Sequence, residues 1–266
     1  MSSSLLELKN ISKTFNEKSG AAHSVLNDVN LEIDSPGEKG FIVSIISAVD
    51  AGKSTLLKII SGLENQSSGS KYLTGSEYNQ ADGSIVYIPE NPSSFPWMSV
   101  KENILFAIKG KDKSVDENVI NKIINDVELT GYEEHFPDDK SSGFRFRISL
   151  ARALVINPKI VLLDDPFKIM SNETKGEIYS LLLHICNNYR TVFILATTNV
   201  IESLILSKTL FLMNKHTGTI FDKMESELGN STISTPLKDQ KFIELLNRVE
   251  LKLREQNITD TITHSV

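Results

Sequence analysis

"SAVDAGKST", residues 47–55, is the stretch that decides the fold. Its second half, from Gly52 to Thr55, matches the end of a loop whose backbone N–H groups hold phosphate at the start of a helix. Its first half departs from such loops, because Ser47 and Asp50 stand where glycine is usual. The sequence therefore raises the question of whether this segment still binds a nucleotide.

The segments on either side of the loop have the pattern that phosphate binding requires. FIVSII (41–46) is an apolar, β-branched run, typical of a strand buried on both faces. STLLKIISGL (54–63) has its apolar residues at helical spacing and meets a helix stop signal at Gly62. The order strand, loop, helix predicts that Lys53 bridges the terminal phosphates and that the hydroxyl of Ser54 ligates magnesium.

The rest of the chain predicts an α/β fold. Residues 5–34 alternate short apolar runs with turn residues, which indicates antiparallel strands. Helical patterns separate several further short strands, predicted at 84–88, 160–163, 192–197 and 209–213. Strands that alternate with helices imply a mainly parallel sheet covered on both faces.

Three regions follow from this pattern. A core is predicted from residues 1–89 and 158–228, with the antiparallel strands as a β subdomain. Residues 90–157 form an inserted helical subdomain, and residues 229–266 form a linker, a helix and a loose tail. One helix of the insert has an apolar stripe of Val119, Ile120, Ile123, Ile124 and Val127. The apolar face of the last helix either packs on its own domain or docks onto a partner.

Composition limits the possible functions. The 266 residues are 40% hydrophobic and 23% charged with a net charge of −6, so no basic field attracts nucleic acid. Cys186 is the single cysteine, which excludes an internal disulfide and a cysteine-rich zinc site and indicates a packed core residue. We see no secretory signal and no run of about 20 apolar residues that spans a bilayer. We expect a protein of a reducing, soluble compartment that remains free to dock onto a membrane protein.

Asp50 and the segment from Asn214 to Thr217 bear on whether the chain is a GTPase. Asp50 resembles the loop of translational GTPases, in which an aspartate at this place is compatible with nucleotide binding, so it suggests altered affinity. A GTPase also needs an Asn-Lys-x-Asp motif, and the segment from Asn214 to Thr217 lacks the aspartate. Of the two changes in the loop, Ser47 is expected to be more unusual than Asp50, because glycine at position 47 permits a tight turn.

Several further motifs decide the family: LELKNISKTF, SVLNDVNLEI, AGKSTLLKIISGLE, FPWMSVKEN, ISLARAL and IVLLDDPF. Over about residues 5–228 the chain resembles an ABC-transporter ATPase subunit, most of all import-type subunits of the nitrate/sulfonate/taurine kind. The resemblance implies a phosphate-loop, RecA-like core, with ATP and magnesium as ligands. It also implies a second ABC subunit and a membrane permease as partners, and a peripheral position on the cytoplasmic side of a membrane.

The resemblance assigns roles to individual residues. Phe15 matches the aromatic that stacks on adenine, although it could also be a core residue at a strand edge. Asp164 matches the acid that holds magnesium together with Ser54. Pro96 and Trp97 lead into the region that meets the membrane subunit in this family. The phosphate-loop contacts correspond to Ser47, Asp50, Ala51, Gly52, Lys53, Ser54 and Thr55.

The chain departs from the family at the positions that act on the γ-phosphate. Asp165 replaces the glutamate that activates water, Glu90 replaces a glutamine sensor, and Thr198 replaces a histidine. Ser171 falls where the subunit-contacting aspartate loop of the family would end, because DPFKIMSN replaces the usual Ser-Ala-Leu-Asp. The signature loop, normally Leu-Ser-Gly-Gly-Gln, corresponds to Lys140-Ser141-Ser142-Gly143-Phe144.

Three functions are therefore weighed. The first is a nucleotide-binding ABC subunit with impaired catalysis, because binding groups remain while hydrolytic groups change. The second is a non-catalytic structural or regulatory subunit of a larger assembly, since a mixed pair would have both composite sites compromised. The third is a fully competent importer ATPase.

Overall fold

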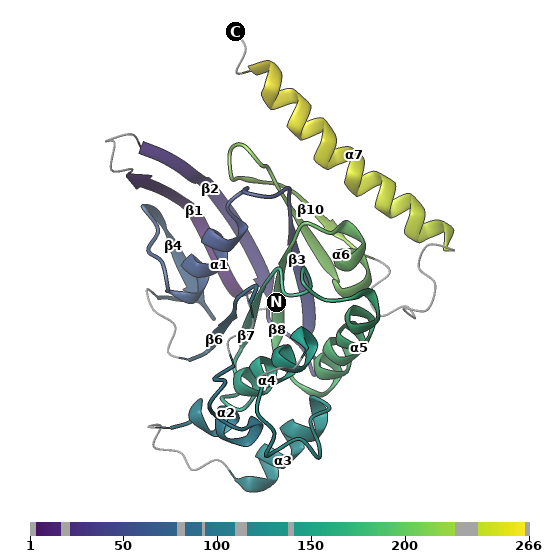
Figure 1. Cartoon of the computed structure of the whole chain (residues 1–266). Helices are drawn as coiled ribbons and strands as arrows, with labels where there is room; N and C mark the ends of the chain where they lie inside the picture. The colour runs from purple at the N-terminus through teal and green to yellow at the C-terminus, as the bar shows by residue number, and fades with distance from the viewer. Residues whose placement is uncertain are drawn as a thin grey trace.

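The computed structural model describes residues 4–16, 22–78, 83–91, 94–109, 116–137, 141–226 and 239–263, with side chains up to residue 256 in the last range (Figure 1). Two sheets and seven helices make up this described part of the chain. The predicted linker after Gly229 lies outside these residues, as does Lys140.

The first sheet is antiparallel and has four strands, in the order β2-β1-β4-β5. Its members are β2 (Ala22–Asp34), β1 (Ser4–Asn16), β4 (Ser68–Leu73) and β5 (Ser76–Glu77). The pairing of β1 with β2 confirms the predicted antiparallel strands. The sequence gives no signal for β4, because SGSKYL lacks a regular apolar alternation.

The second sheet has six strands in the order β10-β9-β3-β8-β7-β6, and every neighbouring pair except β10 with β9 is parallel. Its members are β3 (Phe41–Ile46), β6 (Ile85–Ile88), β7 (Ile160–Asp164), β8 (Val192–Thr197), β9 (Thr209–Met213) and β10 (Ile220–Glu225). The mainly parallel sheet is confirmed.

The helices lie mostly where the apolar spacing predicts them. They are α1 (Lys53–Ser61), α2 (Val100–Phe106), α3 (Glu117–Asp126), α4 (Ser142–Leu154), α5 (Asn172–Asn188), α6 (Val200–Leu206) and α7 (Gln240–Thr263). Gly62 ends α1 in the left-handed conformation, as its stop signal indicates. Val119 is 44% exposed, so the predicted stripe holds only for its other four members. The expected loose tail is wrong as far as Thr263, because α7 continues to that residue.

Strand β3 separates two parts of the core. Val43 and Ile45 pack with α1 and the antiparallel sheet, whereas Ile42 packs with the cluster that contains α4 and α5. Both faces of the parallel sheet are therefore covered, which explains why FIVSII reads as a buried run. Cys186 lies in the α5 cluster, where burial raises the pKa of its thiol to about 12.

Helix α7 packs on its own domain. Phe242 and Val249 are buried in one cluster with Leu204 of α6 and Met224 of β10. An ion pair between Lys252 and Asp222 joins α7 to β10 at the edge of that cluster. Of the two interpretations of this helix, the structure favours intramolecular packing.

Val249→Ala should lower the free energy of unfolding by about 1–2 kcal/mol, because it removes two buried methyl groups from the α6–β10–α7 cluster. Leu251→Ala is the matched control, since Leu251 is 57% exposed on the same helix. Urea denaturation followed by circular dichroism measures both variants. Equal stabilities of the two would mean that α7 is not part of the folded core.

Candidate functional site

The parallel sheet brings the predicted site residues to one edge. Ser47 follows β3, Asp164 ends β7, Thr198 follows β8, and Glu90 lies two residues beyond β6. Because these four strands are parallel, their carboxyl ends meet at the same side of the sheet. In open α/β sheets this is the edge at which ligands bind.

The tight turns of the phosphate loop are at Asp50 and Gly52, with φ values of 64° and 91°. Ser47 does not have a positive φ, so the expectation that serine disturbs a turn there is wrong. Aspartate is one of the few residue types that tolerate the left-handed conformation. A Cβ at Gly52 would lie 3.0 Å from the backbone oxygen of Val25 and 2.9 Å from Leu26 Cδ2, so only glycine fits without strain.

The side chain of Lys53 points back into the phosphate loop. Its Nζ donates to the backbone oxygens of Ser47 and Ala48 at 3.2 and 2.9 Å, and to Ser47 Oγ at 3.0 Å. Burial lowers the pKa of the ammonium, while the nearby carboxylates of Asp165, Asp164 and Asp50 oppose that shift. The Ser47 hydroxyl therefore adds an acceptor for Lys53 that glycine would not supply.

Two further loop residues extend this arrangement. Ala51 is buried beneath the turn, and Thr55 lies in the first turn of α1. No side chain caps the start of α1, where Gly52 is the N-cap residue. The first backbone N–H groups of the helix are therefore left to bind an anion.

Asp164 joins the loop to β7. Ser54 Oγ donates to Asp164 Oδ1 at 2.9 Å, and Tyr87 Oη of β6 donates to Asp164 Oδ2 at 2.7 Å. Burial raises the pKa of Tyr87, so its hydroxyl keeps the proton that it donates. A hydroxyl and a carboxylate oxygen, side by side, fit the oxygen ligands that magnesium prefers. Elsewhere in the described part of the chain, no cluster of three or more His, Cys, Asp or Glu side chains could hold a metal ion.

Asp165 has a constrained position beside the loop. Its φ is 44°, and its N–H donates to the backbone oxygen of Ala196 at 2.8 Å. Burial, reinforced by Glu202, raises the pKa of its carboxyl group, and Lys53 and Lys168 oppose that shift. A left-handed backbone conformation and a half-buried acidic side chain are both typical of functional sites, and Asp165 has both.

Glu202 is a buried carboxylate that sequence reasoning missed. Thr197 Oγ1 donates to its Oε2 at 3.0 Å, and Lys175 of α5 forms an ion pair with its Oε1 at 2.8 Å. Thr198 itself is exposed at the start of the loop that leads into α6. The helical pattern of α6 is too short to have indicated that Glu202 points into the core.

Glu90 forms an ion pair with Lys168, with 2.9 Å between Oε1 and Nζ. Glu90 follows β6 and Lys168 follows β7, so the pair connects two neighbouring strand ends. Ser171, at the end of the same segment, caps α5 by accepting from the Thr174 N–H at 3.3 Å. Its place in a subunit contact stays a prediction.

The predicted signature segment begins α4. Ser141 is the N-cap residue and accepts from the Phe144 N–H at 3.2 Å. Gly143 is buried, and a Cβ there would lie 2.5 Å from Thr174 Cγ2, which explains the glycine. Ser142 is half-buried in the first turn. Phe144 packs edge-on against Tyr132, and Gly143 lies close to Thr174 of α5, so this segment packs against the helical part of the molecule.

Phe15 lies at the far end of β1, opposite His23 of β2. Its ring is 38% exposed, and Lys13 Nζ lies 4.6 Å from its centroid. The interpretation of Phe15 as a buried core residue is therefore not supported. Its stacking on adenine stays a prediction.

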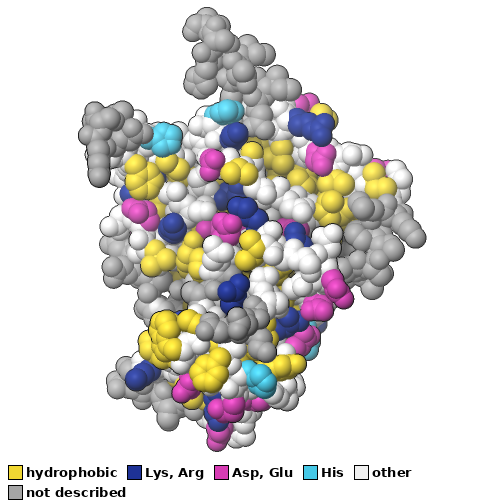
Figure 2. All heavy atoms as spheres, viewed as in Figure 1, with side chains coloured by type: hydrophobic (Ala, Val, Ile, Leu, Met, Phe, Trp, Pro, Cys, Tyr) yellow, Lys and Arg dark blue, Asp and Glu magenta, His cyan; other side chains and the backbone are white. Residues whose placement is uncertain are grey.

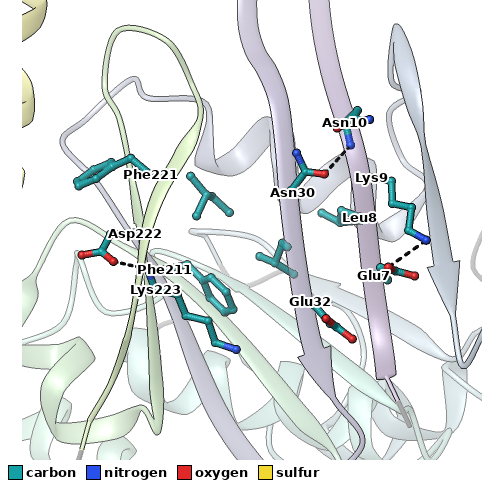
Figure 3. Close-up of a pocket in the computed structure, with 12 residues that line it drawn as sticks. Glu7, Leu8, Lys9, Asn10, Asn30, Glu32, Phe211, Phe221, Asp222 and Lys223 are labelled. Atoms are coloured by element: carbon teal, nitrogen blue, oxygen red, sulfur yellow. Dashed lines mark hydrogen bonds and ion pairs between the residues drawn. The ribbon is translucent and has the colours of Figure 1, made fainter.

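An open groove on another face is separate from this site. Figure 3 shows its walls, formed by β1 and β2 on one side and by β9 and β10 on the other. None of its lining residues belongs to the phosphate loop or to the ends of β6 and β7. The candidate nucleotide site is therefore the edge at Lys53, Ser54 and Asp164.

Comparisons with known proteins agree with this geometry. The family model described as "ABC transporter" matches residues 26–168, which include the phosphate loop and Asp164. The chain belongs to the ABC transporter family. Aliphatic sulfonates import ATP-binding protein SsuB of Bacillus thuringiensis subsp. konkukian (strain 97-27) is 31% identical to this ABC protein, over 92% of this chain and 94% of that one. Bicarbonate transport ATP-binding protein CmpC of Synechocystis sp. is 34% identical, over 79% of this chain and 32% of that one.

Solved structures show the same ABC fold. The cbiO1 protein of Clostridium perfringens, part of an ABC transporter complex, has a TM-score of 0.72 at 19% identity, over 97% of this chain and 99% of that one. A dimeric ATP-binding cassette bound to ADP and Pi has a TM-score of 0.69 at 23% identity, over 84% of this chain and 99% of that one. The predicted fold class and family resemblance are confirmed.

Tyr87→Phe should lower the free energy of unfolding of this ABC protein by about 1–2 kcal/mol, because the buried Asp164 loses a donor. Urea denaturation of Tyr87→Phe, Asp164→Asn and the double variant gives the coupling energy between the two side chains. We expect a clear coupling, with the double variant less destabilised than the sum of the single changes. Additive effects would contradict a direct interaction.

Proposed function

We propose that this chain is the ATP-binding subunit of an ABC-type importer, holding ATP with magnesium but hydrolysing it weakly or not at all. The single observation that carries the proposal is the Ser54–Asp164 pair beside the buried Lys53. The binding groups are assembled there, while the groups expected to act on the γ-phosphate are altered. The names of the relatives, which are import or transport ATP-binding proteins, support the importer role.

Nucleotide binding is supported by the retained groups. The N-terminus of α1 supplies unbonded N–H groups, and Lys53 supplies a positive charge for the terminal phosphates. A bound polyphosphate competes for this ammonium with three loop oxygens. Ser54 and Asp164 would hold magnesium, which neutralises phosphate charge when bound. Phe15, which is partly exposed, would stack on adenine.

Weak hydrolysis is supported by three changed side chains. Asp165 is one methylene shorter than the usual glutamate, so its carboxylate reaches less far toward an attacking water. Thr198 has a short hydroxyl in place of an imidazole donor, and the carboxylate of Glu90 is engaged with Lys168. Loss of one positioned polar group costs about 10²–10³ in rate, although such losses are not additive.

Purified protein should bind ATP-Mg saturably and release phosphate slowly. Lys53→Ala should abolish binding, because it removes the buried cation of the loop. Asp165→Glu should increase phosphate release by about tenfold, because it restores the reach of the carboxylate. Equilibrium dialysis and a phosphate assay measure these quantities. Brisk turnover that disappears in Lys53→Ala would favour a competent ATPase, and no binding would favour a purely structural subunit.

Membrane association is proposed to occur through an aromatic surface, which we define as Phe95, Trp97 and Phe106. The Phe95 ring centroid lies 5.6 Å from that of Trp97 and 4.8 Å from that of Phe106. Trp97 is 69% exposed, and Figure 2 shows hydrophobic side chains gathered over the lobe that carries α2 and α3. Exposed aromatic groups of this kind mark interaction sites.

The partner at this aromatic surface is proposed to be a permease chain on the cytoplasmic side of a membrane. Within the described ranges, no helix has both the length and the apolar character that a bilayer crossing requires. A second ABC subunit, identical or different, would place its own signature segment over the nucleotide. Ser141 at the start of α4 would make the corresponding contact from this chain.

Trp97→Ala should reduce the fraction of the protein that sediments with membranes of its native cells by several-fold, because it removes the most exposed ring of the aromatic surface. Leu63→Ala is the matched control, since Leu63 is 67% exposed outside that surface. Both variants should unfold like the unaltered protein. Equal sedimentation of the two variants would rule out this docking surface.

A further inference from the structure

Two residues that depart from the family pattern face one another at the nucleotide edge. Glu90 stands where the family has glutamine, and Lys168 stands in the segment that replaces Ser-Ala-Leu-Asp. Their side chains form an ion pair of 2.9 Å. A change that introduces a negative charge is therefore matched in space by one that introduces a positive charge.

The Glu90–Lys168 pair is poorly suited to a purely stabilising role. The side chain of Lys168 is 58% exposed and that of Glu90 is 40% exposed. Exposed ion pairs of this kind contribute about 0–1 kcal/mol, because water screens them and the long side chains lose freedom. The Lys168 ammonium can therefore change its partner at little cost.

Lys168 also acts on the phosphate loop electrostatically. The hydrogen bond that Lys168 donates to Glu90 raises the pKa of Lys168 most, and the carboxylates of Asp165 and Asp50 raise it further. Lys168 follows β7 and its partner Glu90 follows β6, so the ammonium lies at the same edge of the sheet as the phosphate loop and Asp164. Lys168 in turn opposes the raised pKa of Asp165.

The charges at this edge explain why a second cation is useful. Asp50, Asp164 and Asp165 contribute three carboxyl groups near the buried Lys53, and the carboxylate of Glu90 acts on Asp165 at the same edge. A nucleoside triphosphate brings several more negative charges, and unscreened repulsion between them opposes binding. A cation on an exposed side chain offsets this repulsion when the phosphates arrive.

We propose that Lys168 is a second cationic ligand for the terminal phosphates of bound nucleotide, and that Glu90 competes with the phosphates for it. This inference rests on the proposed nucleotide binding and adds a residue that determines affinity. When phosphates bind, Lys168 leaves Glu90 for the phosphate oxygens. Loss of Lys168 therefore weakens binding, whereas loss of the Glu90 charge strengthens it.

The opposite signs separate this role from a structural one. A pair that only connects two segments is broken equally by Lys168→Met and by Glu90→Gln, so both changes would shift affinity in the same direction. Under the proposal, Lys168→Met weakens ATP-Mg binding about 3- to 10-fold, and Glu90→Gln tightens it about threefold. Lys168→Arg keeps the charge and should remain within about twofold of the unaltered chain.

Isothermal titration of the full chain with ATP-Mg, ADP-Mg and AMP is the test. The effect of Lys168→Met should be largest for ATP and smallest for AMP, because only the terminal phosphates meet the lysine. Lys122→Met is the matched control, since Lys122 is also 58% exposed and is paired with Asp126 on α3. Circular dichroism checks that each variant is folded.

The outcomes are distinguishable. ATP binding that is unchanged in Lys168→Met, or shifts of the same sign in Lys168→Met and Glu90→Gln, would overturn this inference and leave the proposed function standing. An unaltered chain that does not bind ATP would overturn both. Weaker ATP binding in Lys168→Met and tighter ATP binding in Glu90→Gln, with no change in Lys122→Met, would support the role of Lys168.

Discussion

The hydrogen bond from Ser54 to Asp164 is the constraint on which the site depends. It connects the first turn of α1 to the end of β7 across the intervening strand β8. The bond forms only because β3, β8 and β7 are parallel, so that the loop after β3 and the last residue of β7 lie at the same edge. Tyr87 holds the other oxygen of Asp164 from β6, which ties a fourth strand to the same point.

Charge balance around this bond distinguishes the protein from the family pattern. The loop keeps its lysine in a buried position, where Ser47 adds an acceptor. The rim carries extra acids at Asp50 and Glu90 and an extra base at Lys168. These changes alter the charge around the proposed polyphosphate site. Under the proposed function, binding and hydrolysis depend on different residues, which is why binding is proposed to persist while hydrolysis is weak or absent.

Much of the fold was predictable because local patterns determine it. The strand–loop–helix order around residues 47–55 and the buried runs of the parallel sheet follow from apolar spacing alone. The short α6 and strand β10 gave no such signal, because α6 has only 7 residues and IFDKME of β10 lacks a regular apolar alternation. In the site, Ser54 and Asp164 were predicted. Tyr87 and the Glu90–Lys168 pair were not, because strand register and tertiary packing bring them together. Ser47 was misjudged, since residue type does not reveal which position of the loop has a positive φ.

The most direct test of the account is the chemical state of nucleotide retained by the protein. The purified chain is incubated with ATP-Mg, separated from free nucleotide after one hour, denatured, and its nucleotide identified by ion-exchange chromatography. The account predicts that intact ATP predominates in the unaltered chain. Predominantly ADP, with a matching amount of released phosphate, would contradict it, as would the recovery of no nucleotide at all.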